Sequence, residues 1–343
     1  MSSIGVHGLV FTGRFDAAGV ERAISGAARA GFDLIEFPIF NPDEWDTDLT
    51  RALLAEHGMQ ATASLGLPED RNISSADPAV SAAGESFLTE VVDVVAGIGA
   101  TRLCGVIYGP LAKRFQVATP DEIENGQAAL GRVAKTAAER GIRISIEIVN
   151  RYETNIVNTA AQAVRYVDAI DGPVGIHLDT YHMNIEEPDM FSPVFTAGAR
   201  LNYVHIGESH RGYLGTGTVD FDSFFHALST AEYDGPIVFE SFSSAVVSED
   251  LTGALGIWRN LWDDSDDLAA HANAYIRGAL RAAATIRAAL DVASARRVAG
   301  PRGLVGFMGP SSRARRFVER MVRRRVAASG RRPLGARHGW GGG

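Results

Sequence analysis

The sequence predicts an α/β protein of the (β/α)8, or TIM-barrel, class, formed as a single domain. Three observations carry this prediction. Short apolar or β-branched runs alternate eight times with longer segments of helical pattern, and several of those segments stop at a glycine. No glycine-rich fingerprint follows the first run, so an open, doubly wound sheet is the less favoured alternative.

The elements follow in regular order. The predicted strands are residues 4–11, 33–40, 59–67, 101–108, 143–149, 174–182, 201–207 and 236–241. The Ala-rich segments between them include 16–30, 48–57, 78–98, 121–140, 159–170 and 222–231, and a last helix at 266–290 completes the series. Glycines that mark helix ends as C-cap residues do are Gly31, Gly58, Gly99 and Gly141.

Composition excludes several classes of protein. The chain has 343 residues, 46% of them apolar and 22% charged, which is enough for a large buried core and unlike a disordered chain. Its one cysteine, Cys104, excludes a disulfide framework and a multi-cysteine metal site. The first ten residues lack a signal-peptide pattern and there is no apolar run of about 18 residues, so we expect a soluble, cytoplasmic protein with no membrane partner.

Charge divides the chain at its C-terminal end. The net charge is −8, but from Arg296 onward there are 13 arginines and one acid, Glu319, which leaves 20 basic and 40 acidic residues before them. A body so acidic repels phosphate backbones, so nucleic acid is not expected as a partner. We predict a catalytic barrel at 1–290 and a flexible, largely disordered Arg- and Gly-rich extension at 291–343, with a short helix at 312–328 as an option.

Acidic and imidazole side chains stand near the C-terminal ends of the last four strands, where active sites of such barrels gather. Glu147 alternates with isoleucines and is expected to face the lumen. Asp179, His205 and Glu240 occupy corresponding places on the next three strands. Three converging carboxylates need a compensating charge, and three oxygens with one imidazole suit Mn²⁺ or Mg²⁺, with Co²⁺ as an alternative. The sequence therefore predicts one divalent metal site per subunit.

A second group of polar residues follows these ligands in the predicted loops. Glu153, His182 and Arg211 could bond to the hydroxyls of a small polyol, although each taken alone fits a solvated loop charge better. Other polar residues nearby are interpreted as packed or surface groups, or as partners of a ligand: His177, His210, Glu186, Glu187 and Glu208.

Four linked segments, in this order, resemble the ketose 3-epimerases of the D-tagatose and D-allulose (D-psicose) 3-epimerase family, which are xylose-isomerase-like barrels. The segments are residues 147–155, 177–187, 205–211 and 239–242. The resemblance runs from about residue 4 to residue 290, includes 256–262, and does not extend to the arginine-rich tail. It implies that the four predicted ligands bind the metal and that Glu153, His182 and Arg211 hold the sugar.

The resemblance also implies that Gly66 lines the site at the end of the third strand. Relatives often place aromatic residues at the ends of strands one and four, whereas this sequence has His7 and the segment 106–111 there. His7 is therefore a candidate for contact with the substrate, or else a hydrogen-bonded barrel residue. This departure bears on the preferred ketose rather than on the reaction.

The expected activity is metal-dependent epimerisation of free ketohexoses at carbon 3. Candidate pairs are D-fructose with D-allulose and D-tagatose with D-sorbose. Proton removal at carbon 3 gives an enediolate, and Glu147 and Glu240 are predicted to act as the acid/base pair on its two faces. The family resemblance further suggests a homodimer or homotetramer whose partner molecule is the small ketose.

Two other functions fit the same motifs. One is an aldose–ketose or hydroxypyruvate-type isomerase on the same barrel, in which the proton moves between carbons 1 and 2. The other is a sugar-binding protein without catalysis. A metal-dependent phosphodiesterase is disfavoured because it would need more histidine ligands and a basic groove.

Overall fold

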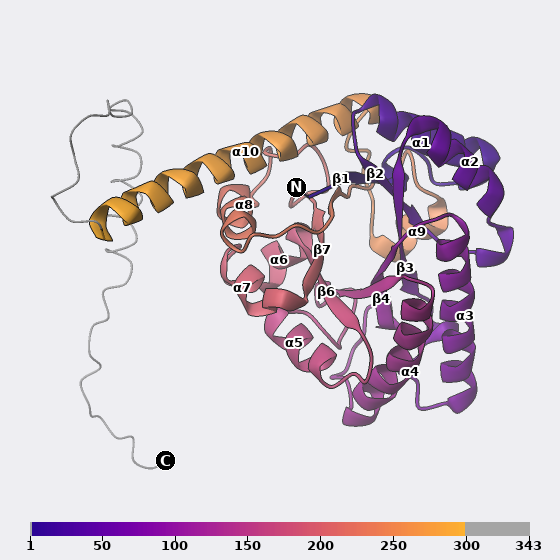
Figure 1. Cartoon of the computed structure of the whole chain (residues 1–343). Helices are drawn as coiled ribbons and strands as arrows, with labels where there is room; N and C mark the ends of the chain where they lie inside the picture. The colour runs from indigo at the N-terminus through magenta and orange to yellow at the C-terminus, as the bar shows by residue number, and fades with distance from the viewer. Residues whose placement is uncertain (1, 299–343) are drawn as a thin grey trace, which may run out of the picture. The chain divides into compact units, whose positions relative to one another are not determined.

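The computed structural model describes residues 2–298. Its eight strands are parallel and form a closed barrel in sequence order, with β1 paired to β8, and helices surround them (Figure 1). The predicted (β/α)8 class is thereby confirmed. The strands are β1 Ile4–His7, β2 Leu34–Pro38, β3 Gln60–Leu67, β4 Arg102–Pro110, β5 Arg143–Glu147, β6 Val174–Asp179, β7 Leu201–Ile206 and β8 Ile237–Phe239.

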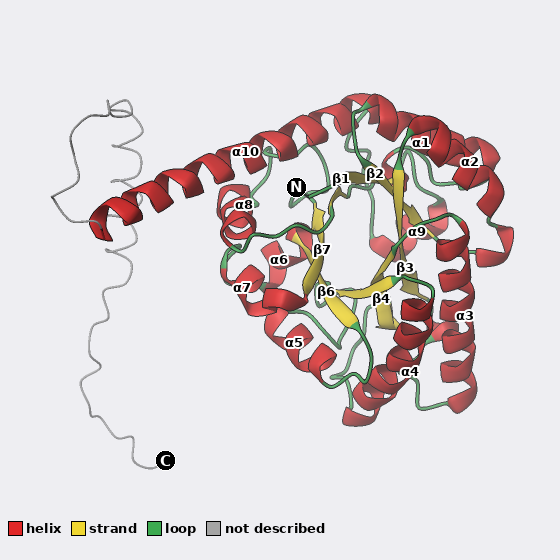
Figure 2. Ribbon diagram, viewed as in Figure 1, coloured by secondary structure: helices red, strands yellow, loops and turns green. Residues whose placement is uncertain are grey.

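Figure 2 separates the strands from the helices outside them. The helices are α1 Ala17–Arg29, α2 Thr47–His57, α3 Pro78–Gly97, α4 Pro120–Glu139, α5 Ala160–Asp168, α6 Thr180–Glu186, α7 Ser192–Ala197, α8 Phe221–Thr230, α9 Glu249–Leu255 and α10 Ser265–Val298. Short 3₁₀ turns are η1 Gly8–Val10, η2 Pro42–Glu44, η3 Glu69–Arg71 and η4 Gly198–Arg200.

Local sequence explains where these helices begin and end. Helix α4 starts with a capping box, in which Thr119 accepts from the backbone N–H of Glu122 while the Glu122 carboxylate accepts from that of Thr119. Helix α2 ends at Gly58, whose φ of +62° lies in the left-handed region that glycine tolerates. Helix α1 buries Val20 and Ile24 on one face, and each such side chain stabilises the fold by about 1.5–3 kcal/mol.

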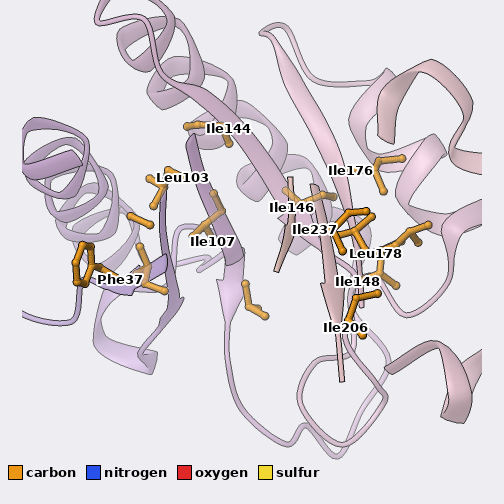
Figure 3. Close-up of a cluster of buried hydrophobic side chains, with 14 of the residues drawn as sticks. Phe37, Leu103, Ile107, Ile144, Ile146, Ile148, Ile176, Leu178, Ile206 and Ile237 are labelled. Carbon is orange, nitrogen blue, oxygen red and sulfur yellow. The ribbon is translucent and has the colours of Figure 1, made fainter. Parts of the chain in front are cut away.

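The main apolar core includes the outward-facing side chains of the strands. Ile144, Ile146 and Ile148 belong to it (Figure 3). Because successive side chains of a strand point to opposite faces, Glu147 is directed toward the lumen, as predicted. The barrel wall thus carries apolar side chains outward and polar ones inward at this level.

Several predicted boundaries are wrong. The predicted first strand, 4–11, ends at His7 because η1 follows at once, and the predicted sixth strand, 174–182, ends at Asp179, where α6 begins. The short helices α6, α7 and α9 were not predicted. Asp179 itself ends the strand, because its carboxylate Oδ1 accepts from the backbone N–H of Tyr181 at 2.6 Å and so caps the new helix.

The chain divides into two compact units, one ending at Ala289 and one beginning at Leu290. Helix α10 continues to Val298, past the predicted end at Leu290. The rest of the predicted tail, including the optional helix at 312–328, lies outside the described residues. Among residues 2–298, no helix has the length and apolar character needed to cross a bilayer.

Candidate active site

The four predicted ligands converge at the C-terminal ends of the last four strands. Glu147 and Asp179 are the last residues of β5 and β6, His205 lies in β7, and Glu240 directly follows β8. One ligand atom from each lies within 4.8 Å of the others, and all four residues are buried. Parallel register contributes to this convergence, because Asp179 pairs with His205 across β6 and β7.

This cluster has the donors that a hard divalent cation requires. Within residues 2–298, the buried Nδ1 atom of His205 has no hydrogen-bond partner. It faces Glu240 Oε1 at 3.4 Å, Asp179 Oδ2 at 3.7 Å and Glu147 Oε1 at 3.8 Å. An orphaned imidazole nitrogen among three carboxylates fits Mn²⁺, Mg²⁺ or Co²⁺ chemistry, since these ions take oxygen ligands with few nitrogens.

The carboxylates of this cluster differ in their electrostatic surroundings. Burial raises the pKa of Glu147 to about 7, against the opposing influence of His205. Burial would also raise the pKa of Glu240, but the positive charges of His205 and Arg211 outweigh it and the pKa is lowered. The pKa values of these two acids are therefore shifted in opposite directions.

Arg211 is the cation nearest to these acids. Its Nη1 atom donates to Glu240 Oε2 at 2.6 Å and to Asp179 Oδ2 at 3.3 Å. The guanidinium lies 4.0 Å from the ring centroid of Tyr181 and 5.0 Å from that of Phe242. Its backbone has a φ of +61°, which is strained for a residue with a side chain. The surrounding contacts thus hold Arg211 in one orientation.

The loop that carries Arg211 is built around a buried carboxylate. Glu208 accepts from the backbone N–H groups of Ser209, Gly215 and Val219. Burial would raise the pKa of Glu208, but these backbone hydrogen bonds lower it. Glu208 therefore stabilises the loop, and these contacts give it no role in the reaction.

His182 and Glu153 meet beside the cluster through Asn150. The Nδ1 atom of His182 accepts from the backbone N–H of Asn150 at 3.1 Å, so the ring proton is on Nε2, which lies 3.6 Å from Glu147 Oε1. The side-chain amide of Asn150 donates to Glu153 Oε1 at 2.7 Å. The predicted substrate residues are thus connected to Glu147 by hydrogen bonds or close contact.

One cavity opens onto the cluster and collects the predicted site residues. Its lining includes His7, Gly66, Glu147, Glu153, His182, Arg211 and Glu240. Asp179 and His205 are fully buried and do not line it. The opposite wall was not predicted: it comes from α9 and the segment after it, through Leu251, Leu255, Ile257 and the 75% exposed Trp258.

Gly66 of β3 and His7 of β1 are the two predicted site residues from the first half of the barrel, and both line this cavity. A Cβ atom on Gly66 would come within 2.3 Å of Leu111 Cδ2, so this glycine allows Leu111 to approach. His7 is 2% exposed; its Nδ1 accepts from the backbone N–H of Leu9, and its Nε2 lies 3.2 Å from Ser64 Oγ. It thus lines the cavity and is also hydrogen-bonded to the barrel.

Glu36, a fully buried carboxylate in the middle of β2, was not predicted as a site residue. Its Oε2 accepts from His205 Nε2 at 2.8 Å, on the side of the imidazole remote from the other three acids. A signal was available, because an acid inside the apolar run Leu34–Pro38 matches the pattern that identified Glu147. Glu36 stands in the middle of its strand, whereas the predicted ligands stand at or near strand ends.

A second group of potential ligands is less suited to a metal. Cys104, His177 and His205 also offer atoms within 4.8 Å of one another. Burial raises the pKa of the Cys104 thiol well above its usual value, so the thiolate that binds metals is disfavoured. His177 is fully buried and its ring meets that of His205 edge-on at 4.1 Å, which makes it a packing group.

The fold and this site define a class, namely (β/α)8 barrels with an acidic, histidine-containing cluster at the C-terminal ends of the strands. The family model described as "Xylose isomerase-like TIM barrel" matches residues 24–263. The chain belongs to this family.

The relatives of this chain carry names that are more specific than that of the family. It is 57% identical to a ketose 3-epimerase of Arthrobacter globiformis over 82% of this chain and 98% of the relative. It is 51% identical to an L-ribulose 3-epimerase of Methylomonas sp. over 80% of this chain and 96% of the relative. The crystal structure of a Methylomonas sp. D-allulose 3-epimerase in complex with D-allulose has a TM-score of 0.80 at 50% identity, covering 81% of this chain and 96% of that one. The resemblance to ketose 3-epimerases is confirmed.

Proposed function

We propose that this protein is an isomerase that epimerises free ketohexoses at carbon 3, with D-fructose and D-allulose as one substrate pair and D-tagatose and D-sorbose as another. The observation that carries the proposal is that Glu147 and Glu240 reach one buried cluster from strands that are three apart in the barrel. The names of the relatives support the reaction type.

The reaction requires proton removal at carbon 3 and proton delivery on the opposite face. Glu147 and Glu240 are the acid/base pair, and the bound epimer decides which of them removes the proton. His182, through Nε2–H, and Arg211 donate hydrogen bonds that orient the hydroxyl groups of the sugar. The carboxylate of Glu153 accepts hydrogen bonds from sugar hydroxyl groups. The cation would be held by Glu147, Asp179, His205 and Glu240. When bound, it supplies Lewis-acid stabilisation of the negative charge that develops on the enediolate.

The cation in this proposal is Mn²⁺ or Mg²⁺, with Co²⁺ as an alternative, because three carboxylates and one imidazole form a hard donor set. Activity after removal of metal and addition of each ion separately identifies the metal that the protein prefers. Activity that survives exhaustive chelation would contradict the metal requirement.

We also propose a homodimer or homotetramer in the cytoplasm. Exposed apolar side chains beside the site support association, since Phe115, Val117 and Tyr152 are 90%, 87% and 57% exposed. Sedimentation of the full chain, with Phe115→Ser as the comparison, tests the assembly. Cell fractionation tests the location. A monomer at micromolar concentration would contradict the proposed homodimer or homotetramer.

The decisive experiment is incubation with D-fructose and Mn²⁺ in D₂O, followed by NMR. We expect D-allulose with deuterium at carbon 3 only. Glucose or mannose with label at carbon 1 or 2 would instead identify an aldose–ketose isomerase. Binding of ketose without exchange of any carbon-bound proton would identify a sugar-binding protein.

A further inference from the structure

Glu36 is a charged group buried in the barrel lumen behind the candidate metal site. Its exposure is 0%, and among the described residues no lysine or arginine forms an ion pair with it. It lies in register with His7 on β1 and Thr62 on β3. A carboxylate in such a place is costly unless polar groups compensate it.

The compensating groups form a chain of directed hydrogen bonds. The Tyr203 hydroxyl donates to Glu36 Oε2 at 2.6 Å, so it accepts from Thr62 Oγ1, which is also 2.6 Å away. An ionised carboxylate has no proton to give, so His205 Nε2 must donate to the same oxygen across 2.8 Å. Both hydrogen bonds therefore end on Oε2; among the described residues Oε1 has no hydrogen-bond partner, and His7 Nε2 lies 3.5 Å from it.

This hydrogen bond determines which nitrogen of His205 is free. A cation bound among Glu147, Asp179 and Glu240 needs an unprotonated Nδ1, because this atom faces all three acids. The ring proton that remains then lies on Nε2, from which it is donated to Glu36. The opposite tautomer would place a proton where a cation should bind and leave Nε2 without a proton to donate to Glu36. The arrangement is therefore that of a metal ligand oriented by a carboxylate on its far side.

We propose that Glu36 is a positioning residue, held by Tyr203, that fixes His205 with Nδ1 free and so strengthens binding of the divalent cation. The proposal rests on the metal-dependent function proposed above. It assigns Glu36 no contact with the ketose or with the cation itself.

The test is Mn²⁺ affinity of the full chain, measured from the EPR signal of free aqueous Mn²⁺ during titration. We expect Glu36→Gln to weaken binding about 10- to 100-fold. The glutamine amide has two possible orientations, and in each its NH₂ group meets another donor. In one it faces Tyr203 and His205; in the other it faces the Nε2–H of His7, which lies 3.5 Å from Glu36 Oε1 in the wild type. Tyr203→Phe should weaken binding in the same direction by less, and it provides the answer if Glu36→Gln fails to fold.

Two matched controls separate positioning from general damage. Glu187→Gln alters a half-buried carboxylate that accepts from the backbone of Ala160, and Tyr166→Phe removes another buried tyrosine hydroxyl. Both should bind Mn²⁺ within about twofold of the wild type. In ¹⁵N-histidine spectra of the Mg²⁺-loaded protein, the ring proton of His205 should lie on Nε2 in the wild type, and this bound form should need more Mg²⁺ to appear in Glu36→Gln.

The outcomes distinguish this proposal from the one on which it rests. Wild-type affinity retained in both Glu36→Gln and Tyr203→Phe would overturn the role of Glu36 and leave the metal site intact. A wild-type protein that binds no Mn²⁺ would overturn both proposals. Equal losses in the control variants would also overturn the positioning role, because the effect would then not be specific to His205.

Discussion

The two halves of the barrel contribute different kinds of side chain to one cavity. Strands β5–β8 and their C-terminal ends supply the four candidate ligands, and the segments that follow supply Glu153, His182 and Arg211. Strands β1–β4 supply small or apolar lining such as Gly66 and Val106, with His7 and Ser64 as polar exceptions. The second half is thus arranged for charge and proton transfer, and the first half for the shape of the space. Substitutions in the two halves should therefore affect different kinetic constants.

The largest effect should come from the two acids of the second half. Glu147→Gln and Glu240→Gln each preserve the shape of the side chain but remove the group that exchanges a proton with carbon 3. We expect kcat for D-fructose to fall about 10²- to 10⁴-fold. Steady-state kinetics with circular dichroism to verify folding is the measurement, with Glu187→Gln as the control. A loss below about fivefold in both variants would contradict the acid/base assignment.

Removal of one ligand charge should have the next largest effect. At Mn²⁺ concentrations of about 100 times the dissociation constant, binding should stabilise the wild-type fold by about 2.7 kcal/mol. Asp179→Asn should lose most of this gain, although asparagine still caps α6. The matched control is Asp16→Asn, since Asp16 caps α1 through a 3.0 Å bond from Gly19 N–H and lies outside the cluster. Thermal unfolding with Mn²⁺ or with EDTA measures both; equal Mn²⁺ shifts in the two variants would refute the ligand role.

A smaller effect is expected in the first half. Gly66→Ala forces Leu111 to move, because the new Cβ would lie 2.3 Å from Leu111 Cδ2. We expect kcat/KM to fall about fivefold, or about 1 kcal/mol, mainly through KM. The double variant with Leu111→Ala should recover part of the loss. Gly278→Ala, where nothing lies within 4 Å, is the control. An effect confined to kcat would contradict the assignment of cavity shape to the first half of the barrel and proton transfer to the second.

The smallest effect concerns acid pH. The pKa of Glu208 is lowered in the folded protein, so the ionised carboxylate stabilises the fold. This stabilisation is fully present above the pKa of glutamate in the unfolded chain, about 4.3, and is lost as the pH falls through the lower pKa of the folded protein. Glu208→Gln should destabilise the protein by about 1 kcal/mol at pH 7 and by progressively less below pH 4. Hydrogen exchange at both pH values should show the change in residues 207–219 and not in the loops after β1–β4. A pH-independent difference would contradict this account.

The order of strands and the four converging ligands could be predicted because both depend on patterns along the chain. Alternation of Glu147 with isoleucines determines its face, and the strand ends of a barrel meet at one rim. The start of α6 could not be predicted this way. The sequence predicts a sixth strand that continues to residue 182, whereas the carboxylate of Asp179 caps a helix there, and this side-chain contact leaves no periodic signal.

Helix α9 and the role of Glu36 were missed for different physical reasons. Helix α9 has only seven residues and none of them is fully buried, so Leu251 and Leu255 form a stripe too short to identify a helix. Glu36 carries the correct signal, but its partners Tyr203 and His205 are about 170 residues away and meet it only across the closed lumen. Long-range polar contacts of this kind require the three-dimensional structure.

The hydrogen bonds from Thr62 through Tyr203 to Glu36 cross the lumen and join strands from opposite sides of the barrel. A fragment containing only β1–β4 would therefore expose an acid that has lost its donors, and a fragment containing only β5–β8 would retain the donors without the acid. Gene fusions that exchange half-barrels between relatives would need to transfer both ends of this link together. The halves differ in chemistry, yet they are not separable building blocks.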